Sequence, residues 1–162
     1  MKIVPFTEDH WNEVAGIYRL GLETGNASFE TEVPDYHTWI KKFRGELLWV
    51  AMIDNTVMGW AGLSPVSVRK VYEGVTEVSI YVHPGYAGKG IAGKLMDHVI
   101  KESEKAGVWT LYSSIFQENI VSIRLHEKHG FRKIGYREKI AKRNGIWRNT
   151  VIYERRSEKF QD

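Results

Sequence analysis

Four glycines at the centre of the chain mark the stretch whose residue types and spacing could do chemistry. Gly85, Gly88, Gly90 and Gly93 lie between an apolar, strand-like run over 78–82 and an apolar stripe at helical spacing. Such a strand-to-helix turn can present unpaired backbone N–H groups at a helix N-terminus, where the helix dipole adds positive potential. Because glycine has no Cβ, a phosphate can approach the backbone closely. The stretch therefore indicates an anion site.

Two common phosphate-binding patterns do not match this stretch. The Gly-Lys-[Ser/Thr] ending of a P-loop is absent. The spacing Gly88-x-Gly90-x-x-Gly93 occurs in dinucleotide-binding folds, but here the preceding strand lies mid-chain, and no acidic residue ends a strand roughly 20 residues later. A short glycine motif is a weak signal, so a plain strand-to-helix turn remains the alternative.

An acidic residue precedes the glycines on the same predicted strand. Side chains alternate between the two faces of a strand, which places Glu77 on one face with Ser79 and Tyr81. A carboxylate there could act as a general base that accepts a proton. From the residues alone, a solvated strand position is the simpler interpretation of Glu77.

Other polar residues could complete such a site. The pKa of a histidine lies near neutrality, so His126 could transfer a proton, although a lone helical histidine is more often a packed structural group. Arg69 could bind a substrate carboxylate in a bidentate manner, or could be an exposed loop charge. The histidines show no metal-ligand spacing, so we expect no metal site.

The composition is that of an ordinary globular protein. The 162 residues are most simply one domain, 1–162, with 43% hydrophobic and 27% charged residues. The absence of cysteine excludes disulfides, thiolate metal sites and a cysteine nucleophile. A net charge of +3 is small, so we expect no nucleic-acid partner. Without a long apolar run or a signal-peptide pattern, we expect no membrane partner and a cytoplasmic location.

The elements that must position these residues follow from hydrophobic periodicity and from turn residues. Strands are predicted over 2–6, 47–53, 57–63, 75–82, 109–116, 131–142 and 147–155. Helices are predicted from Thr7 to about Leu22, over 35–44, from the glycine turn to 106, and over 119–128. The order β-α-α-β-β-β-α-β-α-β-β predicts a mixed α+β fold rather than the regular alternation of a doubly wound sheet.

Two motifs in this order resemble the GCN5-related N-acetyltransferases (GNAT). The window Ala87 to Ala92 is similar to the family's pyrophosphate loop, [Gln/Arg]-x-x-Gly-x-[Gly/Ala], with alanine at its first position. The run from Asn119 to Phe131 is similar to the family's Asn-x-x-[Ala/Ser]-x-x-Leu-[Tyr/His]-Glu-Lys-x-Gly-Phe element, with His126 at the usual tyrosine. The resemblance covers nearly all of the chain. It implies acetyl-CoA as the cofactor and a central, mostly antiparallel mixed sheet flanked by helices.

A third segment narrows the resemblance to the phosphinothricin N-acetyltransferase branch. Those enzymes acetylate glutamate-like amines, including phosphinothricin and methionine sulfoximine. The branch carries an Arg-x-x-Tyr-x-x-Thr-x-Glu run, which Arg69, Tyr72 and Glu77 match with one extra residue before Thr76. The substrate-binding residues that this resemblance implies are Phe29, Glu30, Arg69, Tyr72 and Glu77. A core aromatic and an exposed loop charge remain the alternatives for this set.

The resemblance also implies a mechanism, in which a neutral primary amine attacks the thioester directly. Glu77 would act as the base through a water molecule, Asn119 would contact the pantetheine or the amine, and His126 or Tyr112 would protonate the leaving thiolate. A backbone N–H near Tyr81 or Val82 would bind the thioester oxygen if the sheet opens there. The implied cofactor-binding residues are Ile80, Tyr81, Val82, Gly88, Lys89, Gly90, Ile91, Ala92, Gly93, Asn119 and Ser122.

Two other functions remain open at this point. The acceptor could be another amine, such as a polyamine or a protein N-terminus, or the chain could be a non-catalytic acyl-CoA-binding module. The substitutions at Ala87 and His126 favour the module, whereas Glu77, Asn119 and the glycine turn favour catalysis. Members of this branch are often dimers, so we expect a homodimer.

Overall fold

The computed structural model describes residues 1–161. Its strands are β1 (Lys2–Pro5), β2 (Leu48–Ile53), β3 (Thr56–Pro65), β4 (Val75–Val82), β5 (Thr110–Phe116), β6 (Arg132–Arg143) and β7 (Ile146–Arg156). Its α-helices are α1 (Trp11–Glu23), α2 (Tyr36–Ile40), α3 (Ile91–Lys105) and α4 (Ile120–Lys128). Short 3₁₀ turns, η1 (Glu8–His10), η2 (Lys70–Tyr72) and η3 (Pro84–Tyr86), precede α1, β4 and α3. The predicted order of strands and α-helices is confirmed.

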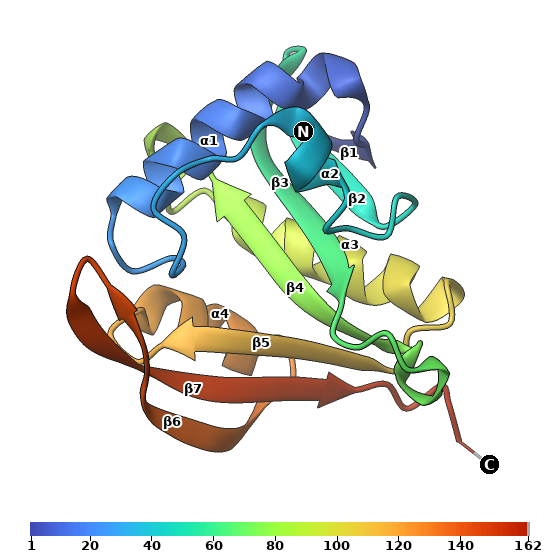
Figure 1. Ribbon diagram of the computed structural model, residues 1–162. Coiled ribbons are helices and arrows are strands. Elements are labelled where there is room, and N and C mark those ends of the chain that lie inside the picture. Colours follow the sequence, from blue (N-terminus) through green and yellow to red (C-terminus); the bar gives the residue numbers. More distant parts are fainter. Residues whose placement is uncertain (162) are drawn as a thin grey trace.

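The strands form one sheet in the order β1-β2-β3-β4-β5-β7-β6, in which only β4 and β5 pair in parallel. The prediction of a mixed, mostly antiparallel sheet flanked by helices is therefore confirmed. Helices α1 and α2 cover one face, whereas α3 and α4 cover the other (Figure 1). The hairpin between β2 and β3 turns at Asp54 and Asn55, both at positive φ, as the right-handed strand twist requires of a two-residue loop.

The parallel pairing of β4 with β5 is short and decides where a ligand can enter. It joins Val75–Glu77 to Thr110–Tyr112 and then stops. Beyond Glu77 the two strands diverge, so the sheet opens between its β1–β4 half and its β5–β7 half (Figure 1). The splay that the mechanism requires is thus present, although nothing in the sequence indicated it.

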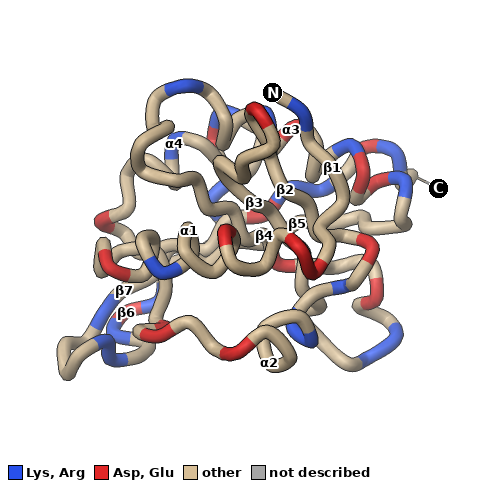
Figure 2. The backbone as a smooth tube through the Cα atoms, turned by 90° about the horizontal axis from the view of Figure 1, so that it is seen from above, with Lys and Arg blue, Asp and Glu red and all other residues tan. Residues whose placement is uncertain are grey.

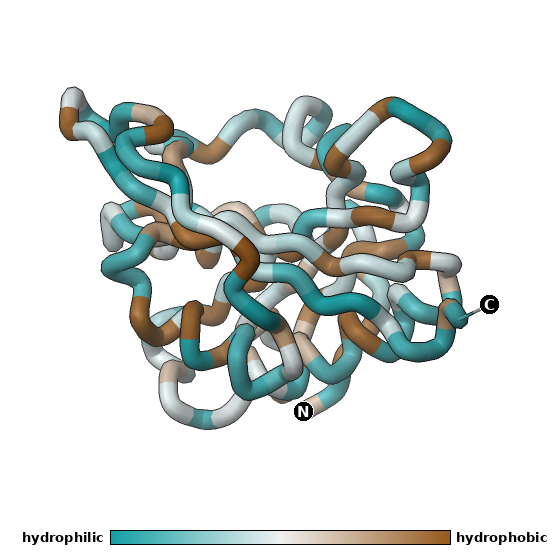
Figure 3. Tube along the Cα trace, turned by 90° about the horizontal axis from the view of Figure 1, so that it is seen from below, coloured by the Kyte–Doolittle hydropathy of each residue, from teal (hydrophilic) through white to brown (hydrophobic). Residues whose placement is uncertain are grey.

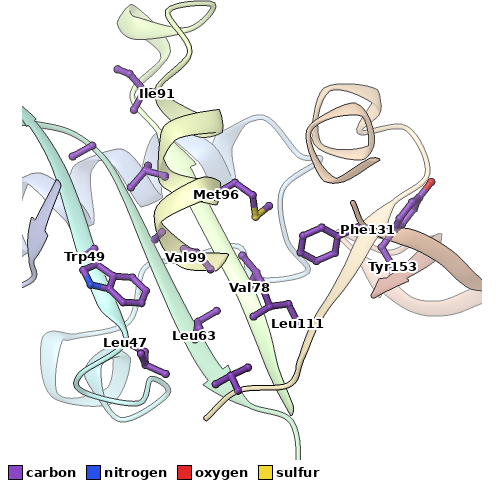
Figure 4. Close-up of a cluster of buried hydrophobic side chains, with 14 of the residues drawn as sticks. Leu47, Trp49, Leu63, Val78, Ile91, Met96, Val99, Leu111, Phe131 and Tyr153 are labelled. Carbon is purple, nitrogen blue, oxygen red and sulfur yellow. The ribbon is translucent and has the colours of Figure 1, made fainter. Parts of the chain in front are cut away.

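Each face of the sheet carries its own hydrophobic core. Met96 and Val99 of α3 are fully buried against the sheet, together with Leu111 and Phe131 (Figure 4). The opposite core gathers around α1 and contains two buried tryptophans, Trp39 and Trp60. Burying a large apolar side chain stabilises the fold by roughly 1.5–3 kcal/mol. Both faces of the sheet are therefore packed against buried side chains.

Two predicted helices differ from the structure at their ends. The helix predicted over 35–44 is only Tyr36–Ile40, because Arg44 already donates its N–H to Leu63 O, at 2.9 Å, and so joins the sheet. Asp35 caps this short helix by accepting the N–H of Thr38. Thr7 caps a 3₁₀ turn, and the α-helix itself begins at Trp11. In residues 1–161, no helix is both long enough and apolar enough to cross a bilayer.

Candidate functional site

A cleft of about 1230 Å³ occupies the opening between β4 and β5. Its walls come from both halves of the sheet, from the turn that follows β4, from the first turn of α3 and from α4 along its length. The segment after α1 and the β6–β7 hairpin close its other end. One cleft therefore contains most of the residues that the sequence indicated as a site.

Unpaired backbone amides line one end of this cleft. Gly88 and Gly90 have φ values of 76° and 77°, a left-handed conformation that favours glycine. The first helical bond of α3 runs from Lys94 N to Gly90 O, so the amides from Gly88 to Gly93 have no backbone acceptor among the described residues. All of these residues except Lys89 line the cleft. The Lys89 ammonium instead lies 4.9 Å from the ring centre of Tyr86.

Backbone groups of β4 point into the opening at alternate residues. His83 donates its N–H to Met58 O of β3, whereas Gly74 O accepts N–H groups from Trp109 and Thr110 on the β5 side. Because backbone groups alternate along a strand, the N–H groups of Ile80 and Val82 face the opening. The N–H of Tyr81 faces β3. Of the two backbone donors predicted for the thioester oxygen, Tyr81 and Val82, only Val82 therefore directs its N–H into the opening.

Glu77 lies where two cavities meet. It lines the large cleft and also a smaller cavity of about 270 Å³, which contains Glu30, Tyr18 and Tyr81. Its side chain is half-buried, and this burial raises the pKa of its carboxyl above the usual value, while the Arg137 guanidinium partly opposes the rise. A raised pKa makes the carboxylate a stronger base, which suits proton removal from an ammonium group.

The remaining predicted substrate residues separate into two groups. Phe29 lines the large cleft, with its ring centre 4.7 Å from that of Phe116 in an edge-on arrangement. Glu30 lines the small cavity. Arg69 and Tyr72 line neither, because they belong to the loop before β4, where the guanidinium lies 5.3 Å from the Tyr72 ring centre. The structure therefore does not bring Arg69 and Tyr72 into the cavities that hold Glu77.

His126 is buried in the cleft wall, and both of its ring nitrogens are occupied. Nδ1 lies 2.7 Å from Ser122 O, and Nε2 lies 2.8 Å from Ser113 Oγ. A carbonyl oxygen can only accept, so Nδ1 carries the hydrogen and Nε2 accepts the Ser113 hydroxyl. Burial lowers the pKa of His126, although the Ser122 carbonyl opposes part of that effect. The ring is therefore neutral near pH 7, and it orients a serine that the sequence analysis missed.

Asn119 and two arginines shape the cleft by connecting distant segments. Asn119 caps α4 by accepting Ser122 N–H, and donates to Asn26 O at 3.1 Å. Arg143 donates to Ser28 O and Leu22 O. Arg148 donates to Gly25 O, Asn26 Oδ1 and Glu118 Oε2. The β6–β7 hairpin, which carries several Lys and Arg residues (Figure 2), is thus fastened to the segment after α1.

Comparisons with known proteins agree with this geometry. A family model described as "Acetyltransferase (GNAT) family" matches residues 11–131. Phosphinothricin N-acetyltransferase of Streptomyces viridochromogenes is 26% identical over 96% of this chain and 87% of its own. L-methionine sulfoximine/L-methionine sulfone acetyltransferase of Salmonella typhimurium is 28% identical over 66% of this chain and 63% of its own.

A solved structure has the same fold. The phosphinothricin acetyltransferase of Sinorhizobium meliloti, crystallised with acetyl-CoA, superimposes with a TM-score of 0.86 over 96% of this chain and 87% of its own, at 23% identity. The family match covers most of the chain and includes the glycine turn and α4. The chain therefore belongs to the acetyltransferase (GNAT) family and is an N-acetyltransferase whose acetyl donor is acetyl-CoA.

Proposed function

We propose that the protein transfers the acetyl group of acetyl-CoA to the primary amine of a small, amino-acid-like acceptor by direct attack on the thioester. The observation that carries this proposal is the position of Glu77, a half-buried carboxylate beside the open edge of β4 and at the junction of two cavities. The names of the Streptomyces and Salmonella relatives support phosphinothricin or methionine sulfoximine as the acceptor.

The glycine turn binds the diphosphate of acetyl-CoA in this proposal. Several free amides converge at the N-terminus of α3, where the helix dipole also favours an anion. Because backbone amides supply these contacts, alanine at position 87 is compatible with binding. Lys89 contributes its N–H rather than its ammonium, which stacks on Tyr86. Ser122, Asn119 and Ile80 line the path of the pantetheine.

The open edge of β4 stabilises the charge that develops on the thioester oxygen. Val82 N–H is the nearest such donor to the glycine turn, and Ile80 N–H is the next one along the strand. A fixed backbone donor aimed at a developing oxyanion is worth about 3 kcal/mol. Glu77 removes the ammonium proton, through a water molecule, so that the neutral amine can attack. Phe29 and Glu30 line the acceptor side. A substrate-binding role for Arg69 and Tyr72 stays a prediction that rests on the family resemblance.

The leaving thiolate needs a polar neighbour, and the Ser113–His126 pair supplies it. Neutral His126 holds its own hydrogen on the Ser122 carbonyl, so it is a positioning residue rather than the acid. The Ser113 hydroxyl can rotate from His126 Nε2 to donate to the thiolate sulfur. Tyr112, which also lines the cleft, is the competing donor.

We expect Ser113→Ala to lower kcat about tenfold, because a hydrogen bond to a charged group is worth about 1.5–3 kcal/mol. The measurement is kcat at saturating acetyl-CoA and amine, followed by thiol release. Tyr112→Phe serves as the comparison and should change kcat by less than about twofold. The opposite ranking of the two variants would assign the thiolate contact to Tyr112.

The β6–β7 hairpin is the surface that supports a homodimer. It projects from the body of the molecule with hydrophobic and hydrophilic segments interspersed along it (Figure 3). Its exposed apolar side chains are Ile134, Tyr136, Ile140, Ile146 and Trp147. Burial of such residues against a second copy would stabilise a dimer. Light scattering of the wild type and of Trp147→Asp tests this: we expect a dimeric wild type and a monomeric variant, and a monomeric wild type would contradict the proposal.

A cytoplasmic location stays a prediction.

A thiol-release assay over several amines tests the proposed function. Wild-type protein should release coenzyme A with L-phosphinothricin or L-methionine sulfoximine, and much more slowly with spermidine or a peptide N-terminus. Faster turnover of the polyamine or the peptide would contradict the proposed acceptor. Tight acetyl-CoA binding without thiol release from any amine would instead support the non-catalytic module.

A further inference from the structure

An amino-acid-like acceptor carries a carboxylate as well as an amine, and that carboxylate needs a partner. Glu77 is suited to the ammonium group, but Arg69 lines neither cavity. The Lys and Arg residues that line the large cleft are Arg124, Lys128 and Arg137. The first two lie on α4, and a Cβ added at Gly93 of the glycine turn would lie 3.7 Å from the ring of His129, which follows that helix. Arg137 comes instead from the hairpin on the acceptor side.

Arg137 is free to bind an anion close to Glu77. None of the ion pairs or side-chain hydrogen bonds formed within residues 1–161 involves its guanidinium. Arg137 and Glu77 line the same large cleft, and no ion pair joins them among the described residues. The Arg137 guanidinium also partly opposes the rise in the pKa of the Glu77 carboxyl. A molecule that carries an ammonium and a carboxylate on one carbon atom could bridge them.

A second, independent feature of the same wall points to a ligand. Thr150 lies opposite Arg137 in the β6–β7 register and lines the cleft. Its side chain is 2% exposed, and its hydroxyl has no hydrogen-bond partner. Leaving such a group unpaired costs roughly 1–3 kcal/mol, and a ligand oxygen would remove that cost. The register also shifts immediately after Arg137, and such bulges commonly redirect side chains beside ligand sites.

We propose that Arg137 and Thr150 bind the carboxylate of the acceptor opposite Glu77, so that the cleft selects α-amino acids over amines that lack a carboxylate. This inference rests on the proposed function and adds the residues that set its specificity. A guanidinium binds a carboxylate through two parallel hydrogen bonds, and the Thr150 hydroxyl can donate a third. A polyamine would instead bring a second positive charge against Arg137.

The test compares an amino acid with its decarboxylated counterpart, L-methionine sulfone and 3-(methylsulfonyl)propan-1-amine, with L-phosphinothricin as a second amino acid. For Arg137→Gln, we expect KM for the amino acids to rise at least about tenfold, because the charge-assisted contact is lost. Its kcat and its KM for acetyl-CoA should stay within about threefold, and the decarboxylated amine should respond little. Arg137→Lys should restore part of the loss, and Thr150→Val should raise KM a few-fold.

A matched control separates this effect from loss of charge alone. Arg19 is exposed on α1, lines neither cavity and forms no ion pair among the described residues, so Arg19→Gln should leave both KM values unchanged. Equal KM for the amino acids in wild type and Arg137→Gln would overturn the proposal. A wild-type preference for the decarboxylated amine would also overturn it. A rise in KM for the amino acids in Arg69→Gln but not in Arg137→Gln would have the same meaning.

Failure of the proposed function would be recognised separately, as no thiol release with any amine. Calorimetric titration of L-methionine sulfone and L-phosphinothricin into protein saturated with coenzyme A then decides the inference. We expect Arg137→Gln to weaken the Kd of the better ligand at least about tenfold. Equal Kd values, or no binding of either amino acid to the wild type, would contradict it.

Discussion

Glu77→Gln is expected to lower kcat/KM for the amine by about 10²- to 10⁴-fold, the usual contribution of a positioned general base. Glutamine has nearly the same shape and keeps the hydrogen-bonding positions, so the change removes the basic carboxylate and little else. Steady-state kinetics with varied amine measure it. Glu73→Gln is the matched control, because Glu73 is exposed in the turn before β4 and lines neither cavity.

The pH profile gives this prediction a second readout. Burial raises the pKa of Glu77, and the base is active only when ionised. Activity should therefore fall as the pH decreases through this pKa, and the acidic limb of kcat/KM should lie above the ordinary glutamate value of about 4.3. The limb should be lost in Glu77→Gln. A near-normal rate in that variant, or an unchanged acidic limb, would show that another group removes the proton.

Gly90→Ala is the second change with a large expected effect. The residue has φ of 77° at the N-terminus of α3, and a side chain there costs roughly 1–2 kcal/mol because its Cβ approaches the following carbonyl. Relief of that strain would move the amides that are proposed to hold the diphosphate. We expect KM for acetyl-CoA to rise at least about tenfold, with a smaller change in KM for the amine.

Gly107→Ala provides the matched control for that substitution. Gly107 has φ of 83° just after the other end of α3, and a Cβ there would also meet no atom within 4 Å. Both variants should therefore lose similar stability in thermal unfolding, but only Gly90→Ala should weaken acetyl-CoA. Equal KM values for acetyl-CoA in the two variants would show that acetyl-CoA does not bind at the glycine turn.

The elements near the site were predictable because their signals are local. Alternation along 75–82 correctly predicted that Glu77, Ser79 and Tyr81 share a face, since all three line the small cavity. The glycines at positive φ and the capping Asn119 follow from backbone sterics and from the unpaired amides at a helix end. Such features depend on a few neighbouring residues, so the sequence alone contains them.

The parts that could not be predicted depend on contacts between distant segments. The pairing of β4 with β5 joins strands that are separated by α3 and stops after Glu77 and Tyr112, and no local pattern encodes where it stops. Arg148 binds residues more than a hundred positions earlier, and Arg137 lines the same cleft as Glu77 from a different half of the sheet. The sequence indicated Ser113 as a site residue only weakly, through a hydroxyl group on a predicted apolar strand. Its pairing with His126 needed the register of β5 against α4.

A crystal structure of the protein with acetyl-CoA tests the central claim most directly. The account predicts the diphosphate within hydrogen-bond distance of the backbone amides from Gly88 to Gly93, and the thioester in the opening between β4 and β5, near Val82 N–H and on the side of Glu77. A diphosphate bound elsewhere, or a thioester remote from the Glu77 carboxylate, would contradict it.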